Sequence, residues 1–368
     1  MDRFSERTRE LERRLATEGA DGAIIATGPN AYYFSGFTGE RDRHLVLLIT
    51  PDGERTFVSG ASYVGQVRDN AKLGEILCVP DNTAASVVEG LVSALPTADG
   101  TYFVDDRMRT EESHRIRAAV PDATFELLSE VVAPMRVTKD ETELDGLRRA
   151  ARLTDEVSTE IRKLGTEAVG MTERELAVEI RTRLHERGAV GEAFPAVVAA
   201  GLNGARPTEY RHGDREIGAG EPVVVDFGGF FDGYASDQTR TVVFDGDPPE
   251  GFVEAHGVVY AALEAGVAAA TPGATGGDID AAAREVIEEA GYGEQFTTGT
   301  GHGVGLRGHE PPSISPGSED ELREGMVFSV EPGIYVEGEW GVRLETIVAL
   351  TADGPEPLNE SPYTWKPL

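Results

Sequence analysis

Two aspartates, Asp226 and Asp237, occupy positions where carboxylates are costly unless they bind something. Asp226 ends the apolar run PVVVD, which is typical of a buried strand, and residues 236–244 are typical of its return strand after the turn signal at 232–233. A two-residue loop at 231–232 places the two aspartates opposite each other, and a loop at 232–233 places them on a diagonal. Both registers keep them on one face, because side chains alternate with a period of two. Two carboxylates on one apolar face repel each other, so we expect a cation or a shared proton between them.

A second hairpin offers two more carboxylates, Glu331 and Glu345. The apolar run that ends at Glu331 and the run 341–348 flank Gly338, and a hairpin centred on Gly338 places the two glutamates opposite each other. Pro332 has no amide hydrogen for a β-ladder, so the first strand must bulge or end there. The sequence therefore predicts a facing pair of carboxylates on each of two hairpins.

The two hairpins belong to an internal repeat. Residues 214–228 and 319–333 align without a gap at an offset of 105, and seven positions of the same type coincide, including the carboxylate that ends each apolar strand. Turn chemistry alone produces some of this likeness, but seven ungapped coincidences favour two related half-domains. A single pair of carboxylates is more often an exposed surface feature, whereas two pairs on repeated units favour metal ligands.

A fifth group of ligand type is His302, in the glycine-rich segment 298–306. The glycines allow the backbone to pack closely around the imidazole, and no lysine follows in the order that a phosphate-binding loop requires. Four carboxylates and one imidazole form a hard, oxygen-rich site for Mn²⁺, Co²⁺, Fe²⁺ or Zn²⁺, and four negative charges balance two divalent ions. Two metals about 3.5–4 Å apart can hold a hydroxide and polarise a carbonyl, which suits hydrolysis of an amide or similar C–N bond.

The chain resembles the pita-bread metallopeptidases, in the branch of the Xaa-Pro aminopeptidases and Xaa-Pro dipeptidases (prolidases). It has their ligand order of Asp, Asp, His, Glu and Glu, and the spacings fit. The segments that carry the resemblance are 225–228, 236–241, 301–306, 309–312, 330–333 and 342–345. The expected fold is a creatinase-like α/β N-terminal domain over 1–135, followed by an α+β pita-bread catalytic domain over 136–368 with an internal pseudo-two-fold repeat.

The resemblance assigns each of the five groups to a metal. Asp226 would bind one ion, and Asp237 and Glu345 would bridge both ions. His302 and Glu331 would bind the second ion, and Glu331 would also handle the proton of the attacking water. The expected cofactors are two divalent ions, with Mn²⁺ the first expectation and Co²⁺, Fe²⁺ or Zn²⁺ the alternatives. A hydroxide that bridges the two ions is the expected nucleophile.

The resemblance also implies contacts with the substrate. His309, seven residues after His302, would contact the substrate carbonyl or stabilise the tetrahedral intermediate. Arg343, two residues before Glu345, would contact the periphery of the metal site or a substrate carboxylate, with an ordinary ion pair as the alternative. Thr239 is similar to a residue that hydrogen-bonds a ligand carboxylate.

The sequence departs from the family pattern at one position. The family usually has a substrate-binding histidine about 17 residues before the first metal-binding aspartate, and Glu209 stands there instead. The nearest histidine is His212, three residues further on. Either the loop shifts so that His212 enters the site, or the histidine is absent. In the second case cleavage before proline is in question, and Glu209 would meet a positive group such as a free amino terminus.

Local patterns predict the helices and strands that carry these residues. In the first domain we expect strands at 22–26, 44–49, 56–58 and 101–104, and helices at 5–19, 83–95 and 109–119. In the second domain, helix starts are predicted by capping boxes at Thr138 with Glu141 and at Thr172 with Glu175. Two further helices are expected near 251–270 and 278–290, so this half is α+β.

The net charge excludes several kinds of partner. The chain has 65 acidic and 34 basic residues, a net charge of −31, and only four of the basic residues are lysines. So acidic a chain repels nucleic acid and anionic membranes, which bind clustered positive charge. The acidic excess is spread along the chain and predicts a salt-adapted, halophile-like source, because salt would screen the repulsion. An ordinary acidic protein is the alternative.

Other features of the sequence limit the classes of protein to which the chain can belong. No run approaches the ~20 apolar residues of a membrane helix, and the charged N-terminus lacks a signal-peptide core. Cys78 is the single cysteine, which excludes an internal disulfide framework and a cysteine zinc cage. We expect a cytoplasmic protein that acts on small peptides, and the resemblance implies a homodimer.

The expected activity is metal-dependent hydrolysis of the peptide bond before proline. One alternative is a non-peptidase C–N hydrolase of the same fold, similar to ectoine hydrolase or creatinase. Another is a non-catalytic metal-binding relative, which would be expected to lose ligands. Creatinase works without metal and does not keep this full carboxylate set, so the intact set favours metal chemistry.

Overall fold

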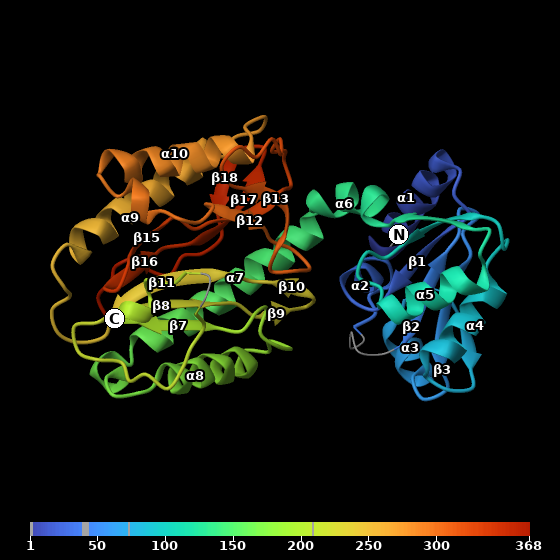
Figure 1. Cartoon of the computed structure of the whole chain (residues 1–368), viewed down its shortest axis with the longest axis horizontal. Helices are drawn as coiled ribbons and strands as arrows, with labels where there is room; N and C mark the ends of the chain where they lie inside the picture. Colours follow the sequence, from blue (N-terminus) through green and yellow to red (C-terminus); the bar gives the residue numbers. More distant parts are fainter. Residues whose placement is uncertain (1–2, 39–43, 73, 208–209) are drawn as a thin grey trace. The chain divides into compact units, whose positions relative to one another are not determined.

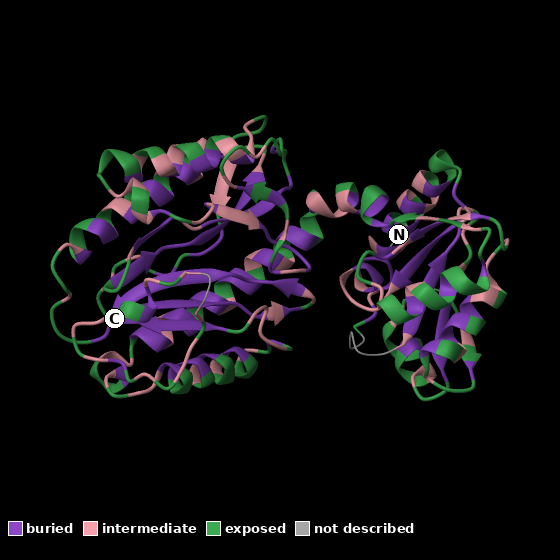
Figure 2. Cartoon of the chain, in the orientation of Figure 1, coloured by how far each residue is buried: buried purple, intermediate pink, exposed green. Residues whose placement is uncertain are grey.

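Figure 1 shows the computed structural model of the chain, in which residues 3–38, 44–72, 74–207 and 210–368 are described. The backbone divides into two compact units, Met1–Arg136 and Val137–Leu368. In both units most strand residues are buried, and most exposed residues lie on helices and loops (Figure 2).

The first unit is an α/β unit with one six-stranded sheet. Its elements, up to residue 137, are α1 (Arg3–Glu18), β1 (Gly22–Ala26), α2 (Pro29–Ser35), β2 (Leu45–Ile49), β3 (Arg55–Gly60), α3 (Val64–Asn70), β4 (Glu75–Val79), α4 (Ala84–Ala94), β5 (Thr101–Val104), α5 (Thr110–Ala119), β6 (Thr124–Leu127) and α6 (Ser129–Val137). The strand order is β4-β3-β2-β1-β5-β6. The strand β2 is antiparallel to β1 and β3, whereas β3–β4, β1–β5 and β5–β6 are parallel pairs.

The strands and helices predicted in this unit are present within a few residues, and five elements were not predicted. Of these, β4 and β6 are edge strands with exposed residues, so they lack the apolar alternation of the inner strands. Leu127 on β6 is 55% exposed. The helix α6 contains Pro134, which in sequence is typical of a break rather than a helix. The other two, α2 and α3, have seven residues each, too few to show a helical period.

The second unit is α+β. Its elements are α7 (Glu141–Arg162), α8 (Glu173–Glu186), β7 (Val197–Ala200), β8 (Pro222–Phe227), β9 (Phe230–Phe231), β10 (Tyr234–Ala235), β11 (Gln238–Val243), α9 (Phe252–Ala269), α10 (Gly276–Glu289), β12 (Gly301–Gly303), β13 (Glu310–Ile314), β14 (Val327–Val330), β15 (Gly333–Val336), β16 (Trp340–Arg343), β17 (Thr346–Thr351) and β18 (Gly354–Pro357). The two larger sheets have the orders β11-β8-β7 and β13-β12-β14-β17-β18.

The second unit consists of two halves, each with a helix pair against a sheet. The helices α7 and α8 share one apolar core with β7, β8 and β11, and α9 and α10 share another with β14, β16 and β17. In Figure 1 the strands lie between the two helix pairs. The repeat is visible in matching backbone bridges, Thr172 with Glu216 and Thr275 with Glu321, each at the start of the second helix of its half. The predicted fold class, with its pseudo-two-fold repeat, is confirmed.

Capping boxes start three of these helices. The predicted box at Thr172 with Glu175 begins α8, and a similar box at Thr275 begins α10. The box predicted at Thr138 with Glu141 was wrong, because α7 begins two residues later with Asp140 as its cap. Thr138 instead pairs with Met326 in an antiparallel bridge, which holds its backbone extended.

The hairpin of the two aspartates adopts the second of the two registers considered. Thr239 lies opposite Asp226 in the ladder between β8 and β11. The turn falls at Asp232 and Gly233, with φ angles of 50° and 88°, which glycine and aspartate tolerate. Asp237 therefore lies diagonally across from Asp226, on the same face.

The hairpin of the two glutamates is centred on Gly338, as predicted. The ladders pair Val330 with Thr346 and Gly333 with Arg343, which leaves Glu331 and Glu345 facing each other between two paired stretches. The strand β14 ends at Val330, one residue before Glu331 and two before the proline that cannot donate to a ladder.

Among the described residues, α9 is the one helix long and apolar enough to cross a membrane, with a mean hydropathy of 1.2 over 18 residues. Its residues Phe252, Val259 and Leu263 are buried in the core that α9 shares with α10 and the strands of its half. Its apolar character is therefore explained by packing inside the unit.

Candidate metal centre

Three carboxylates from both hairpins meet in the interior of the second unit. Asp226 is the penultimate residue of β8, Asp237 precedes β11, and Glu345 lies between β16 and β17. One oxygen of each lies within 4.8 Å of the others, and all three side chains are buried. The amide of Glu345 donates to the carbonyl of Thr239 (3.2 Å), which joins the two hairpins beside the cluster.

His302 and Glu331 complete the set of five. The Nε2 atom of His302 on β12 lies 3.2 Å from Glu331 Oε1 and 3.7 Å from Asp237 Oδ2. Ser329 fixes both residues, because its hydroxyl donates to Glu331 Oε1 (3.0 Å) and accepts the amide of His302 (3.1 Å). The structure thus brings together all five groups proposed as metal ligands, and their role as ligands stays a prediction.

Burial raises the pKa of three of these carboxyls. It is the largest cause of the raised pKa of Asp226, of the strongly raised pKa of Asp237 and of the pKa of about 8 for Glu345. Neighbouring negative charge adds to the shift, from Glu345 on Asp237 and from Glu331 on Glu345. Without a cation, this cluster disfavours its own ionised state.

Glu331 and His302 behave as a pair. Burial alone would raise the pKa of Glu331, but the hydrogen bond and charge of His302 hold it below its usual value. Burial alone would lower the pKa of His302, but the hydrogen bond and charge of Glu331 raise it to about 9. Without a metal the pair is an imidazolium and a carboxylate.

Two unpartnered oxygens test whether a cation fits this cluster. Asp226 Oδ1 and Glu345 Oε1 are buried and have no hydrogen-bond partner among the described residues. A buried carboxylate oxygen without a donor is costly, and a divalent ion would satisfy both oxygens. The donor set of four carboxylates and one imidazole therefore fits hard divalent ions.

Arg343 and Thr239 contact the candidate ligand carboxylates and hold them in place. Arg343 is buried, its Nη2 donates to Asp226, and its Nε lies 3.7 Å from Glu331 Oε2. The hydroxyl of Thr239 donates to Glu345 Oε2 (2.7 Å) and accepts from Arg343 Nε (3.2 Å). Arg343 is thus held in ion pairs with the carboxylates rather than presented to solvent.

Tyr335, Ser329 and Arg240 also contact the site and were not predicted from the sequence. Tyr335 accepts from Arg343 Nη1 (3.2 Å), and the guanidinium of Arg240 donates to the carbonyl of Glu345 (2.7 Å). Nothing in their local sequence distinguishes them from core residues. The contact of Arg240 arises when the two hairpins pack together, whereas Tyr335 meets Arg343 within one hairpin.

The cluster opens into a cavity of about 360 Å³. It is lined by Phe194, Pro207, Arg211, Asp226, Asp237, Thr298, Gly299, Gly301, His302, His309, Glu331 and Arg343. The ring of His309 stacks on that of His302, with centroids 3.6 Å apart and an angle of 29° between the planes. Burial and the charge of His302 lower the pKa of His309, so its imidazole is neutral near pH 7. A neutral imidazole there can donate a hydrogen bond to a substrate oxygen.

The structure does not place His212 in this lining. Its Nδ1 atom lies 2.8 Å from the carbonyl oxygen of Ala196, to which it donates, so the ring serves the local backbone. The neighbouring residue that lines the cavity is Arg211. Glu209 lies outside the described residues.

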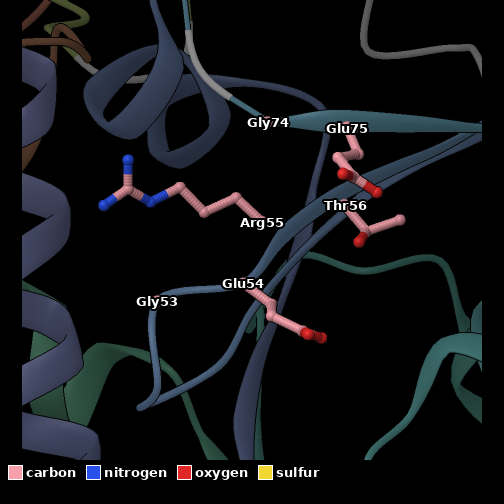
Figure 3. A pocket seen from close by; sticks show the side chains of 6 residues that line it. All are labelled: Gly53, Glu54, Arg55, Thr56, Gly74 and Glu75. Atoms are coloured by element: carbon pink, nitrogen blue, oxygen red, sulfur yellow. The ribbon is translucent and has the colours of Figure 1, made fainter.

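A second hollow lies in the first unit, between β3 and β4. Its volume is about 450 Å³ and its lining is Gly53, Glu54, Arg55, Thr56, Gly74 and Glu75 (Figure 3). Arg55 points away from the two glutamates and pairs with Glu12 on α1 (2.7 Å). This lining brings together no set of groups for catalysis or metal binding.

Comparison with known proteins assigns each of the two units to a protein family. The profile of metallopeptidase family M24 matches residues 145–352, and that of the Creatinase/Prolidase N-terminal domain matches residues 7–138. The chain belongs to metallopeptidase family M24, with a creatinase/prolidase-type N-terminal domain, as the sequence predicted. It is therefore a peptidase of the hydrolase class.

Among the similar proteins within this family are peptidases named for Xaa-Pro substrates and prolidases. The chain is 32% identical over 366 residues to an Xaa-Pro dipeptidase of Lactobacillus delbrueckii subsp. lactis, with 98% of both chains covered. The crystal structure of a prolidase from Thermococcus sibiricus superimposes with a TM-score of 0.91 at 32% identity over all of both chains. An X-Pro aminopeptidase from Thermotoga maritima superimposes with a TM-score of 0.86 at 32% identity, over 98% of this chain and 99% of that one.

Proposed function

We propose that this chain is a dinuclear, metal-dependent Xaa-Pro peptidase that hydrolyses the peptide bond before proline. The observation that carries the proposal is the convergence of five ligand-type side chains around two buried, unpartnered carboxylate oxygens. Similarity over nearly the whole chain to an Xaa-Pro dipeptidase and a prolidase supports the substrate class.

In this proposal Asp226 would help to hold one ion, His302 and Glu331 would help to hold the other, and Asp237 and Glu345 would serve both. Two divalent ions there, with Mn²⁺ the first expectation, would activate the attacking water and polarise the scissile carbonyl. Co²⁺, Fe²⁺ and Zn²⁺ suit the same donor set.

The chain's own residues supply the remaining steps. Glu331, an ionised carboxylate in the cavity wall, accepts the proton of the attacking water and passes it to the leaving nitrogen of proline. His309, held by its stack on His302, donates a hydrogen bond to the oxygen that gains negative charge. Arg343 favours the ionised forms of Asp226 and Glu331 and orients both carboxylates through its ion pairs.

A substrate panel tests this function. Metal-free protein and protein loaded with Mn²⁺ or Co²⁺ are compared in molar KCl on an Xaa-Pro dipeptide, a longer Xaa-Pro peptide, a peptide without proline, and ectoine. We expect metal-dependent turnover of the proline substrates alone. Turnover of ectoine without cleavage of any proline peptide would favour a non-peptidase hydrolase of the same fold instead.

We also propose that the protein is a salt-adapted, cytoplasmic homodimer. The net charge of −31 supports the first part, because such a surface is best tolerated where salt screens it. Size-exclusion chromatography with light scattering in molar KCl measures the assembly. A mass of about twice the 39.4 kDa chain is expected, and a single-chain mass contradicts the dimer.

A further inference from the structure

Three consecutive residues beside the cavity, 210–212, are fixed in place. The hydroxyl of Tyr210 donates to the buried carboxylate of Glu173. The carbonyl of Arg211 accepts the amide of Val198 on β7 (2.8 Å), and His212 donates to the carbonyl just before β7 (2.8 Å). The two flanking side chains and the backbone of Arg211 are thus used for anchoring, which leaves the guanidinium of Arg211 available.

Glu173 is the centre of this anchoring. Its side chain is completely buried at the start of α8. Besides Tyr210, it accepts the amide of Ala200 (2.8 Å), the side-chain amide of Asn203 (2.9 Å) and the amide of Gly213 (3.1 Å). A buried carboxylate with four donors is a rigid support, so the loop between β7 and β8 presents Arg211 from a firm base.

The guanidinium of Arg211 is the available positive charge in the cavity wall. Arg211 is exposed and lines the cavity, and among the described residues it has no ion-pair partner. The other cations there are committed, Arg343 to Asp226 and His302 to Glu331. The charge of Arg211 acts on His309 in the cavity wall. Burial and the charge of His302 are larger causes of the lowered pKa of His309, and the charge of Arg211 is a further one.

We propose that Arg211 binds the free α-carboxylate of the substrate and so selects Xaa-Pro dipeptides over Xaa-Pro amides and longer peptides. The inference rests on the proposed Xaa-Pro peptidase function and names the group that reads substrate length. In a dipeptide the carboxylate lies one residue beyond the scissile carbonyl, whereas each further residue moves it about 3.5 Å away. A guanidinium recognises a carboxylate by two parallel hydrogen bonds, which an amide cannot offer.

Arg211 could form the same ion pair with the carboxylate of an acidic side chain at the first position of the substrate. The experiment therefore uses three substrates, Ala-Pro, Ala-Pro-NH₂ and Glu-Pro-NH₂, with the Mn²⁺-loaded protein. Ala-Pro carries only the terminal carboxylate, Ala-Pro-NH₂ carries none, and Glu-Pro-NH₂ carries only the side-chain carboxylate. The variants are R211Q, R211K and the matched control R206Q, because Arg206 is exposed on the same loop and does not line the cavity.

For the wild-type protein we expect kcat/KM to be on the order of 10- to 100-fold higher for Ala-Pro than for Ala-Pro-NH₂, mainly through KM. R211Q should remove most of this preference, R211K should keep part of it, and R206Q should keep it whole. Loss of activity by the same factor on both substrates in R211Q would overturn the inference. A preference for Glu-Pro-NH₂ over Ala-Pro-NH₂ that only R211Q removes would also overturn it.

Titration calorimetry gives the same comparison without turnover. L-proline and L-prolinamide cannot be cleaved, so their affinities for the Mn²⁺-loaded protein report the carboxylate contact alone. We expect L-proline to bind more tightly to the wild-type protein and the two ligands to bind alike to R211Q. Equal affinities in the wild-type protein would overturn the role of Arg211 even if Xaa-Pro peptides are cleaved. Failure to cleave any of them would contradict the proposed function separately.

Discussion

At the scale of single residues, the site is an unbalanced set of buried charges. Asp226, Asp237 and Glu345 are buried together with raised pKa values, and two of their oxygens have no hydrogen-bond partner in the part of the chain that the structure describes. A folded protein tolerates such a cluster when a bound cation compensates it or when some of the carboxyls stay protonated. The charge of this cluster therefore depends on pH and on whether metal is bound.

Neutral replacements of Asp237 and Glu345, the two carboxylates proposed to be shared by both ions, test this. We expect Asp237→Asn and Glu345→Gln each to lower kcat/KM by about 1000-fold or more, because each would remove a proposed ligand of both ions. The metal-free variants should melt at or above the wild-type temperature, because each removes a buried carboxyl whose ionisation is unfavourable without a cation. Activity assays and melting curves with and without Mn²⁺ measure both effects.

Asp232→Asn is the matched control for these variants. Asp232 is an exposed residue in the turn of the same hairpin, and asparagine tolerates its positive φ. Wild-type activity is expected from it. A wild-type melting shift with Mn²⁺ in Asp237→Asn would contradict a ligand role for that residue.

The pKa shifts also predict how metal binding depends on pH. The folded, metal-free protein binds more protons than the unfolded chain, at Glu345 between about pH 4.5 and 8 and at His302 between about 6.5 and 9. The contribution of these two groups to stability therefore falls as the pH rises through this window. Metal ligands must be deprotonated, so metal affinity should rise over the same range.

Melting curves with and without Mn²⁺ at pH 6, 7 and 8 measure this effect. The increase in melting temperature caused by Mn²⁺ should grow with pH. Calorimetry in buffers of different ionisation enthalpy should show proton release on metal binding at pH 7. An increase that is constant or shrinks with pH would contradict the assigned protonation states.

At the scale of elements, close backbone contacts decide where the ligands lie. Gly301 on β12 packs so tightly on β14 that an added Cβ would lie 2.1 Å from the carbonyl oxygen of Ser329. Gly301→Ala must therefore push β12 away from β14 and displace His302. We expect Mn²⁺ affinity to fall at least about 10-fold, as for loss of a ligand-orienting contact. Titration calorimetry measures it.

Gly257→Ala provides the comparison for this variant. Gly257 lies on the exposed face of α9, where an added Cβ meets nothing within 4 Å. In a helix this change should stabilise the protein by about 0.5–1 kcal/mol and leave metal affinity unchanged. Equal metal affinities of Gly301→Ala and the wild-type protein would show that the β12–β14 contact does not position His302.

The strands that carry the carboxylates were predictable because they are apolar, end in charge and flank strong turn signals. The register of the first hairpin remained open from sequence, since loops at 231–232 and at 232–233 both fit, and the structure has the second. The start of α7 was misplaced, because Thr138 has the residue types of a cap but pairs with Met326 instead.

The residues around the metal ligands were harder to predict. The contact of Ser329 with His302 and the place of Arg211 in the cavity wall depend on how separate segments pack, and the contact of Tyr335 with Arg343 depends on the register of their hairpin, none of which a local pattern encodes. His212 is the histidine nearest the expected position, but its neighbour Arg211 is the residue that lines the cavity. Sequence spacing identifies a segment near the site but not which of its side chains faces the cavity.

At the scale of the whole molecule, charge should govern stability. With a net charge of −31, repulsion between acidic groups destabilises the folded state. Salt screens this repulsion, because the Debye length falls from about 10 Å at 0.1 M to about 3 Å at 1 M. We expect the melting temperature to rise by at least about 5 °C between 0.1 and 1 M KCl. Scanning calorimetry measures it, and a flat profile would contradict salt adaptation.

The central claim is that five side chains from the two hairpins and β12 hold two divalent ions. Anomalous diffraction from crystals soaked in Mn²⁺ tests it most directly. Two anomalous peaks are expected, one against Asp226, the other against His302 and Glu331, with Asp237 and Glu345 between them. An absence of peaks at the cluster, or five side chains turned away from one another, would contradict the claim.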